Sequence, residues 1–446
     1  MKPACKWVSV TFIAAALVMS AAAATWAAPQ EQQAQAKPNY TLAEYNAYMD
    51  AHGEKDPQAR IKKLDDFVMK FPGSALMMYI YGDYDATYFS LKNYPKTIEY
   101  VDKLLALPMV DIGTRLQTLG YRAQASLYGS GEKELQTPEA YTKSKDAAAQ
   151  GLQTLGQWQK PANMTDDQFA NNKKVLGVLF NSVAGIAESG LKDYKSAADS
   201  YKAVLALDPT DAVTHFRLGV AFLQQMPPDA PNGFWELSRS IALKGPGEAQ
   251  VRTYLRNQLL HYQQPSCDKL ADDEINQMIT LAATSADRPA SLTIPSADDL
   301  KKAQEDTNNF LPWLQEGGDH GKVMWLATCG LEYPDVGVKV LDIMPGDNDS
   351  FTLKVYRPAA SDTDAAAKEM DAATTPNMEV HIVGQPDVKR LMKDDAVRFT
   401  GTLKDYQQSP FLLTWDNAKV NPEDLQPAPS GGKRPAKAAA PKKPGA

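Results

Sequence analysis

The chain has 446 residues, of which 54 are acidic and 47 are basic, so its formal net charge is −7. Residues 1–27 and 426–446 carry two and five cations and no acid, which leaves the body between them at −14. A body with this charge repels phosphate backbones, and we therefore expect no broad binding to nucleic acid.

Residues 1–27 have the features of a secretory signal peptide. Two lysines precede the apolar run WVSVTFIAAALVMSAAAA, and the small-residue stretch ATWAAPQ follows it. This order predicts cleavage after Ala24 or Ala27 and a mature bacterial protein that is exported, periplasmic or secreted. An uncleaved anchor is the alternative, because the apolar run approaches spanning length. We expect no transmembrane segment after cleavage.

Residues 40–286 alternate apolar-periodic runs with short Gly, Pro or Asn breaks, a pattern that predicts helical hairpins. Two further helices, at 247–263 and 270–284, should close the end of the stack. The five expected hairpins are 41–72, 75–107, 113–156, 168–208 and 211–244.

The clearest repeat is AGIAESGLKDYKSAADSYKAVLALDP, which is followed by LGVAF, and Gly219 in the second stretch lies 34 residues after Gly185 in the first. Gly185 is expected to form a notch that receives Ala197 of the second helix, with Tyr194 and Tyr201 filling the volume beside it. Pro209 should end the second helix.

This pattern of small, aromatic, Ala, aromatic and Pro positions resembles the tetratricopeptide repeat family. The match is good over 178–223 and looser over 40–156, where Arg60 and Thr97 stand at positions that favour Ala. The resemblance implies a mainly α protein with a tetratricopeptide-like solenoid, whose concave surface binds a protein or peptide.

In family members that grip a C-terminal carboxylate, the first helix of a hairpin offers a Lys and, one turn later, an Asn. The matching pairs in this sequence cannot form such a clamp, so no carboxylate-clamp peptide is expected. These pairs are Gly82 and Ala86, Gln117 and Tyr121, Ser182 and Ile186, and Phe216 and Val220. The groove is therefore expected to be apolar and aromatic, and ordinary packing between repeats is the alternative role for each candidate contact. The candidates are Tyr79, Phe89, Tyr121, Phe216 and Val220.

Residues 287–333 are expected to be a linker with one helix, LKKAQEDTNNFLPWLQ, capped by Ser296. Five short strands are then expected over 334–425, which suits a small β-barrel. They are VGVKVLDI, SFTLKVYRP, NMEVHIVG, AVRFTGTL and FLLTWDN. The stretch MKDDAVRFTGTLKDY resembles a segment that recurs in OB-fold domains, and the insertion AASDTDAAAKEMDAATTP should form a helix or long loop.

OB folds that bind nucleic acid carry aromatic side chains on their strands, with basic neighbours. Phe399, Phe411 and Trp415 supply aromatics, but carboxylates surround them in KDD, DNDS and SDTD. A protein-docking or structural barrel is therefore the expected role.

Cys267 and Cys329 remain after signal removal, and an oxidising compartment predicts a disulfide between them. Two separate buried thiols are the alternative. Two cysteines without a nearby His pattern fall short of a zinc site, so no metal or cofactor is expected.

The sequence contains no GxSxG, HExxH or CxxC pattern, and GGDHGK at 317–322 is interpreted as a turn. We assign no catalytic residue and expect a non-enzymatic exported adaptor. The alternative is an envelope enzyme, or an enzyme accessory factor, with a site between the repeat and β domains. Residues 426–446 should form a disordered basic tail, either solubilising or in contact with anionic envelope polymers.

Overall fold

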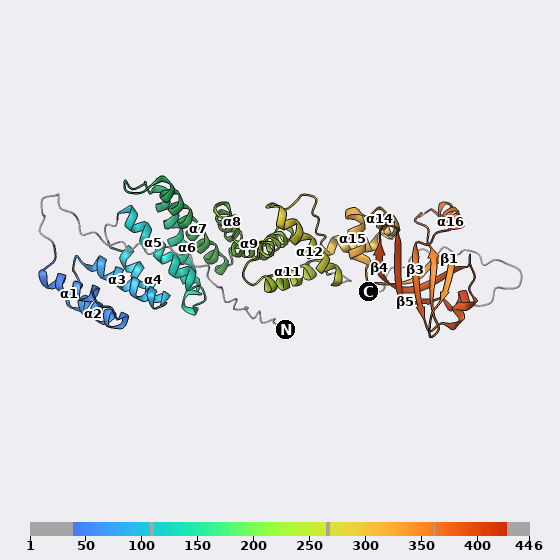
Figure 1. Cartoon of the computed structure of the whole chain (residues 1–446), viewed down its shortest axis with the longest axis horizontal. Helices are drawn as coiled ribbons and strands as arrows, with labels where there is room; N and C mark the ends of the chain where they lie inside the picture. The colour runs from blue at the N-terminus through green and yellow to red at the C-terminus, as the bar shows by residue number, and fades with distance from the viewer. Residues whose placement is uncertain (1–38, 108–110, 265–267, 361, 426–446) are drawn as a thin grey trace. The chain divides into compact units, whose positions relative to one another are not determined.

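The computed structural model of the chain describes residues 39–107, 111–264, 268–360 and 362–425 (Figure 1). The expected signal peptide and the basic tail lie outside these residues. The described chain falls into two compact units. The first extends to Arg252 and includes Leu281–Asp287, and the second comprises Thr253–Thr280 and the chain from Arg288 onward.

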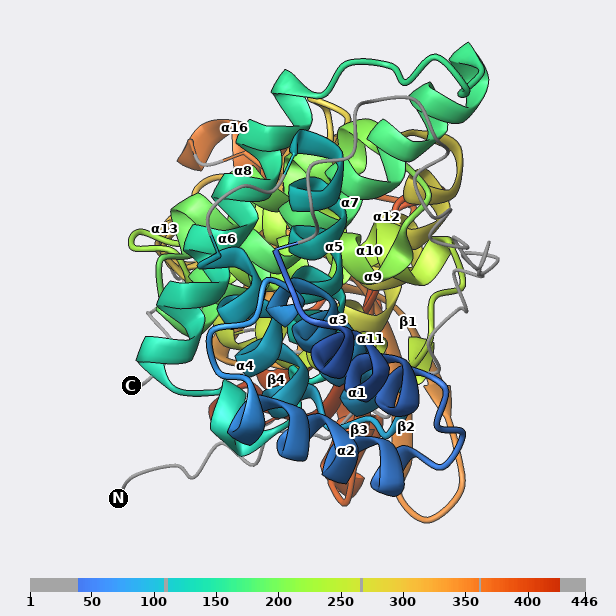
Figure 2. The ribbon, with the colours of Figure 1, turned by 90° about the vertical axis from the view of Figure 1, so that its left-hand side faces the viewer.

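Five helical hairpins make up most of the first unit, and their bounds lie close to those predicted. Each hairpin packs on the next, through α2 and α3, α4 and α5, α6 and α7, and α8 and α9. In Figure 2, α4 and α6 lie to the left of α3 and α5, and α2 lies below α1. The hairpins are α1 (Leu42–His52) with α2 (Pro57–Lys70), α3 (Met77–Ser90) with α4 (Tyr94–Leu105), α5 (Ile112–Tyr128) with α6 (Pro138–Gln157), α7 (Asp166–Gly190) with α8 (Tyr194–Leu207), and α9 (Ala212–Gln224) with α10 (Ala230–Ala242).

Short polar side chains fix where these helices begin. Thr165 accepts a hydrogen bond from the Gln168 backbone N–H, and the Gln168 side chain returns to the Thr165 backbone in a capping box. Asp193 accepts from the Ser196 N–H at the start of α8. Such caps satisfy backbone donors that have no partner inside the helix.

The notch at Gly185 is filled by a different side chain from the one expected. A Cβ atom at Gly185 would lie 2.5 Å from the Tyr201 ring, so this ring, and not Ala197, occupies the notch. Both Tyr201 and Ala197 are fully buried, and the Tyr201 hydroxyl lies 3.3 Å from Ser189 Oγ. Gly185 is therefore needed because an aromatic ring packs directly on the backbone of α7.

The next hairpin uses glycine in the same way. A Cβ atom at Gly219 would lie 2.9 Å from the Gly233 carbonyl oxygen and from Leu237, so α9 and α10 approach closely there. Pro209 lies in the turn between α8 and α9, as expected, and its carbonyl oxygen is 3.1 Å from His215 Nε2.

Helices α11 (Glu248–Gln263) and α12 (Asp268–Thr284) also match their predicted ranges. Their larger parts belong to the second unit. Within it, Gln263 donates to Glu274 Oε2 at 2.7 Å, and Lys322 Nζ lies 2.9 Å from Glu274 Oε1. Because Glu274 is buried, these contacts compensate a carboxylate that would be costly to bury alone.

Residues 287–333 contain three helices where a linker with one helix was expected. These are α13 (Ala297–Glu305), α14 (Phe310–Glu316) and α15 (Gly318–Thr328). Ser296 caps α13, as predicted. The expected turn at GGDHGK is limited to Gly317, because α15 begins at Gly318. The φ angles of 72° at Gly317 and 58° at Gly318 suit glycine.

This segment is not a linker, because its helices share a core with the barrel. Buried apolar residues of α13, α14 and α15 join those of the strands in one cluster, which includes Leu300, Leu311, Met324, Val338, Leu353 and Val397. The helices therefore fold as part of the second unit.

The predicted five strands close into a barrel in the order β1-β2-β3-β5-β4. The β3–β5 pair is parallel and the other neighbours are antiparallel. Helix α16 (Thr363–Ala372) forms within the predicted insertion. The strands are β1 (Glu332–Pro345), β2 (Ser350–Tyr356), β3 (Met378–Val383), β4 (Ala396–Gln407) and β5 (Leu412–Val420).

Two of the strand aromatics face the barrel core. Phe399 and Trp415 are each 1% exposed, and their rings meet edge to face with centroids 5.3 Å apart. Phe411 is partly buried against the same core. Phe399 and Trp415 therefore stabilise the barrel and cannot stack on the bases of a nucleic acid.

Candidate functional site

Each first helix of the five hairpins carries three residues at the spacing i, i+3 and i+7, which places them on one helix face. On α1, α3 and α5 we call this set the first-helix face. Its members are Leu42, Tyr45, Met49, Tyr79, Gly82, Ala86, Thr114, Gln117 and Tyr121. This face combines large apolar side chains with substantial exposure.

Helix α1 contributes the most exposed apolar part of the face. Leu42 is 75% exposed, Met49 is 44% exposed and Tyr45 is 40% exposed. These three residues were not among the contacts predicted from the sequence, although they have the same spacing as Tyr79, Gly82 and Ala86 one hairpin later. That spacing, applied to α1, is the signal that would have identified them.

Helix α3 adds a shallow, open stretch. Tyr79 is half-buried, and its ring centroid lies 5.8 Å from that of Tyr48 on α1. A Cβ atom at Gly82 would have no heavy atom within 4 Å, apart from its own surroundings on the helix. Ala86 is exposed. Helix packing therefore does not require glycine at position 82. The backbone of α3 is open there to an approaching chain.

Helix α5 carries Tyr121, which is 40% exposed and is the most open of the predicted contacts. Phe89 is half-buried in a cluster with Tyr94 and Tyr128, at centroid distances of 5.9 and 6.0 Å. Tyr128 is the exposed member of that cluster, at 44%. The alternative role, packing between helices, therefore describes Phe89.

On α7 and α9 the same spacing gives a more covered surface. Leu179 and Ser182 of α7 are buried, and Phe216 and Val220 of α9 are half-buried. The predicted candidates thus do not form one uniformly exposed surface. The accessible apolar part lies on α1, α3 and α5.

Acidic groups border the face on α3. Both carboxylate oxygens of Asp83 lie 3.0 Å from His52 Nδ1, and burial raises the pKa of Asp83 despite this bond. Asp85 is 5% exposed and makes no hydrogen bond or ion pair with any described residue. Burial, followed by the charge of Asp83, raises the pKa of the Asp85 carboxyl to about 7.

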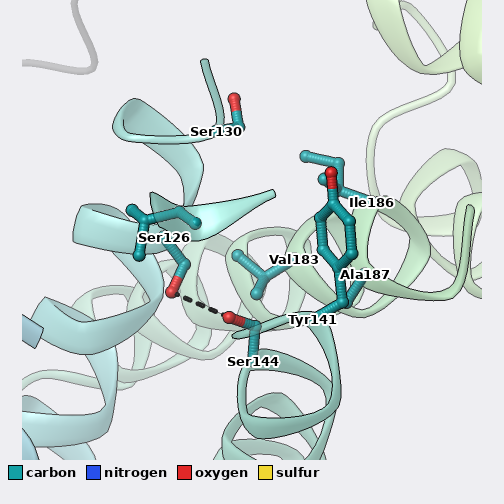
Figure 3. Close-up of a pocket in the computed structure, with 8 residues that line it drawn as sticks. Ser126, Ser130, Tyr141, Ser144, Val183, Ile186 and Ala187 are labelled. Carbon is teal, nitrogen blue, oxygen red and sulfur yellow. Dashed lines mark hydrogen bonds between the residues drawn. The ribbon is translucent and has the colours of Figure 1, made fainter. Parts of the chain in front are cut away.

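A small cavity lies beside Ile186, between α5, α6 and α7 (Figure 3). Its volume is about 10 Å³, which is at the lower limit for one water molecule. Ser126 and Ser144 face each other across it, with their Oγ atoms 3.4 Å apart. Pockets for small molecules usually measure several hundred Å³, so this cavity fits packing better than a substrate.

Histidines in the described chain are held by carboxylates in several places. His215 Nδ1 lies 2.5 Å from Glu236, and His381 Nδ1 lies 2.8 Å from Asp416. The described residues include no group of three or more His, Cys, Asp or Glu that could hold a metal ion. Over the same residues, no helix has the length and apolarity needed to cross a membrane.

Cys329 is buried and disulfide-bonded. Cys267, its expected partner, lies outside the described residues, so the Cys267–Cys329 pairing stays a prediction. Thiol titration of the unreduced, unfolded mature chain tests it, because two free thiols per chain would exclude the bond.

No protein-family model matches the chain, and no curated protein matches it. Solved structures similar to it include the apo form of RapI, with 12% identity and a TM-score of 0.33 over 64% of this chain and 96% of that chain. Another is the C-terminal part of a TPR repeat-containing protein from Cytophaga hutchinsonii, with 16% identity and a TM-score of 0.24 over 54% of this chain and 94% of that chain.

Proposed function

We propose that the protein is a non-enzymatic adaptor that binds a protein or peptide partner through the first-helix face. The observation that carries this proposal is the exposure of Leu42, Tyr45, Met49 and Tyr121 on the matching faces of first helices. Covering one such side chain contributes about 1.5 to 3 kcal/mol. A partner that covers several of them therefore binds without any deep pocket.

The shape and chemistry of the face favour an extended segment. Gly82 leaves the α3 backbone open, and Tyr121 and Tyr45 offer flat rings with a polar edge. Tyrosine is enriched at protein interfaces because it combines a large apolar area with a hydrogen-bonding hydroxyl. No Lys or Arg belongs to the face, so a carboxylate-clamp peptide is not the proposed partner.

The proposed location is the bacterial envelope, on the basis of the signal sequence at residues 1–27. In this proposal the OB-like barrel and its three attached helices serve as a structural or protein-docking module. Phe399 and Trp415 support this role, because both side chains are buried in the barrel core and are not available to bind a nucleic acid.

Site-specific photo-crosslinking in the native envelope tests the proposal. A photoreactive residue is placed at Met49 or Tyr121, and as a matched control at Met69 of α2, which is 72% exposed but lies on a second helix. We expect one discrete adduct, of the same mass, at both face positions and none at Met69. Adducts at all three positions, or at Met69 alone, would contradict the proposed site.

A further inference from the structure

Arg357 follows strand β2 directly, and the fold holds both its backbone and its side chain. Its backbone N–H donates to Asn377 Oδ1 at 2.9 Å, and Asn377 Nδ2 donates to the Arg357 carbonyl oxygen at 2.7 Å. Asn377 is buried, so it anchors this loop from inside the barrel domain. The guanidinium Nη1 donates to the Gly337 carbonyl oxygen of β1 at 3.1 Å. These three bonds fix the position of the guanidinium before any ligand binds.

The charge of Arg357 has no counterion among the residues that the structure describes. The side chain is half-buried and makes no ion pair with them. Burial lowers the pKa of the Arg357 guanidinium, and no carboxylate acts on it in the opposite direction. Glu369 is bonded to the same loop, but its Oε2 accepts from the Ala359 N–H at 3.0 Å. Because a cation that is withdrawn from water without a partner costs free energy, this arrangement is not explained by the stability of the barrel alone.

Two other arginines of this chain show which edge of a guanidinium binds a carboxylate here. Arg398 Nε and Nη2 each lie 3.1 Å from an oxygen of Asp424. Arg122 presents the same two nitrogens to Asp102, at 2.6 and 3.4 Å. In Arg357, Nε and Nη2 bond to no described residue, and neither nitrogen is sealed from solvent. The edge that binds a carboxylate in the other two arginines is therefore free in Arg357.

We propose that the Nε–Nη2 edge of Arg357 is a binding site for the carboxylate of a ligand, in the geometry of the Arg398–Asp424 pair. A planar guanidinium bonds both oxygens of a carboxylate through two parallel N–H donors, and such charge-assisted bonds are about twice as strong as neutral ones. One edge supplies one positive charge and two donors, which matches a carboxylate, whereas a phosphate dianion requires further charge. The carboxylate comes from a small acid or from an Asp or Glu side chain of a protein. The site lies in the second unit and is independent of the first-helix face.

Arginine modification mapped by mass spectrometry tests this site on the native protein. Phenylglyoxal is applied in sodium acetate and, at equal ionic strength, in sodium chloride. We expect acetate to slow the modification of Arg357 by roughly threefold or more, because a bound carboxylate covers the reactive nitrogens. Arg390 is the internal control, since its side chain is 54% exposed and already bonds Asp387, and its rate should be the same in both salts. Equal rates at Arg357 in the two salts, or equal slowing at Arg390, would overturn the proposal.

Thermal unfolding of variants provides a second measurement. We expect acetate, relative to chloride, to raise the unfolding midpoint of the second unit in the wild-type chain and in Arg390→Gln, but not in Arg357→Gln. Arg357→Lys keeps the charge and lacks the two parallel donors, so it should lose most of the response. A response of wild-type size in Arg357→Lys would overturn the two-nitrogen site, because charge alone would then attract acetate. If Arg357→Gln does not fold, the modification rates of the unaltered protein still decide the question.

Further probes separate the sources of the carboxylate and test the choice of anion. Acetate stands for a small acid, and acetyl-aspartate amide stands for an Asp side chain of a protein. Slower modification of Arg357 with both probes would support a protein side chain as the source, and slower modification with acetate alone would support a small acid. Stronger protection by inorganic phosphate than by either carboxylate, at equal ionic strength, would overturn the assignment of a carboxylate site.

Discussion

The hairpins α3–α4 and α7–α8 use equivalent positions in opposite ways. In α7, Ser182 is buried and Gly185 lies against the Tyr201 ring. In α3, the equivalent positions hold Gly82, which is open to solvent, and Asp85, which is buried without a partner among the described residues. One hairpin is closed by a ring packed on glycine, and the other leaves its face open and buries a carboxyl group.

The difference shows what sequence spacing determines. Spacing fixes which residues share a helix face, because the helix has a constant rotation per residue. Whether that face is accessible depends on neighbouring helices, which the spacing does not specify. Hence Tyr121 is exposed while Val220, at the equivalent position of α9, is half-buried.

The largest expected effect is at the buried carboxyl of the open hairpin. The pKa of Asp85 is raised from 3.8 to about 7, so its neutral form is favoured in the folded state. Below about pH 4 the Asp85 carboxyl is neutral in both the folded and the unfolded state, so the folded state keeps its full stability. The folded state becomes less stable as the pH rises through 7, because the buried group must then ionise. We expect Asp85→Asn to stabilise the first unit by about 2 to 4 kcal/mol at pH 8 and by little at pH 4.

Chemical denaturation at the two pH values, followed by circular dichroism, measures this effect. The matched control is Asp199→Asn on α8, where the side chain is 68% exposed and no pH-dependent gain is expected. Equal gains for the two variants, or a larger gain for Asp85→Asn at pH 4, would contradict an uncompensated buried carboxylate.

A single added methyl group should lower the stability of the closed hairpin, α7–α8. In Gly185→Ala the new Cβ atom would lie 2.5 Å from the buried Tyr201 ring, so the ring or the helix must shift. We expect a loss of about 1 to 3 kcal/mol, which is typical of overpacking. Thermal unfolding of the first unit measures it, and an unchanged midpoint would show that the ring is free to move.

Side chains on the open and covered parts of the face should separate binding from folding. We expect Tyr45→Ser combined with Tyr121→Ser to weaken capture of the crosslinked partner at least tenfold, or about 1.4 kcal/mol, with little change in stability. Phe216→Ser should instead lower the free energy of unfolding by about 1 to 2 kcal/mol, because Phe216 is half-buried. If Phe216→Ser weakened partner capture and the double variant lowered only the stability, the binding surface would lie on α9.

Local signals explain how much of this fold could be predicted. Hairpin bounds and Ser296 were correct because caps and apolar periodicity act within a few residues. Residues 287–333 were mistaken for a linker because their role depends on packing against a barrel that follows in sequence. Ala197 was placed in the Gly185 notch because the repeat pattern does not specify which side chain of the second helix points there.

The candidate site was predicted only in part for the same reason. Tyr121 was selected and is exposed, whereas the three residues of α1 were missed because the resemblance is loose in that hairpin. Phe399 and Trp415 could not be assigned to the core from the sequence, since alternation in a strand identifies two faces without saying which one is inside.

The smallest expected effect tests the open face directly. Gly82→Ala adds a methyl group where no heavy atom lies within 4 Å of the new Cβ position, and alanine is about 1 kcal/mol more favourable than glycine inside a helix. We therefore expect a gain of about 0.5 to 1 kcal/mol in the stability of the first unit, opposite in sign to Gly185→Ala. Urea unfolding of both variants under one condition measures the pair. A loss of stability in Gly82→Ala would mean that another part of the chain covers α3, because only a covered helix face penalises a methyl group. Retained stability with weaker capture of the partner would instead place the partner's backbone against Gly82, where a methyl group prevents close approach.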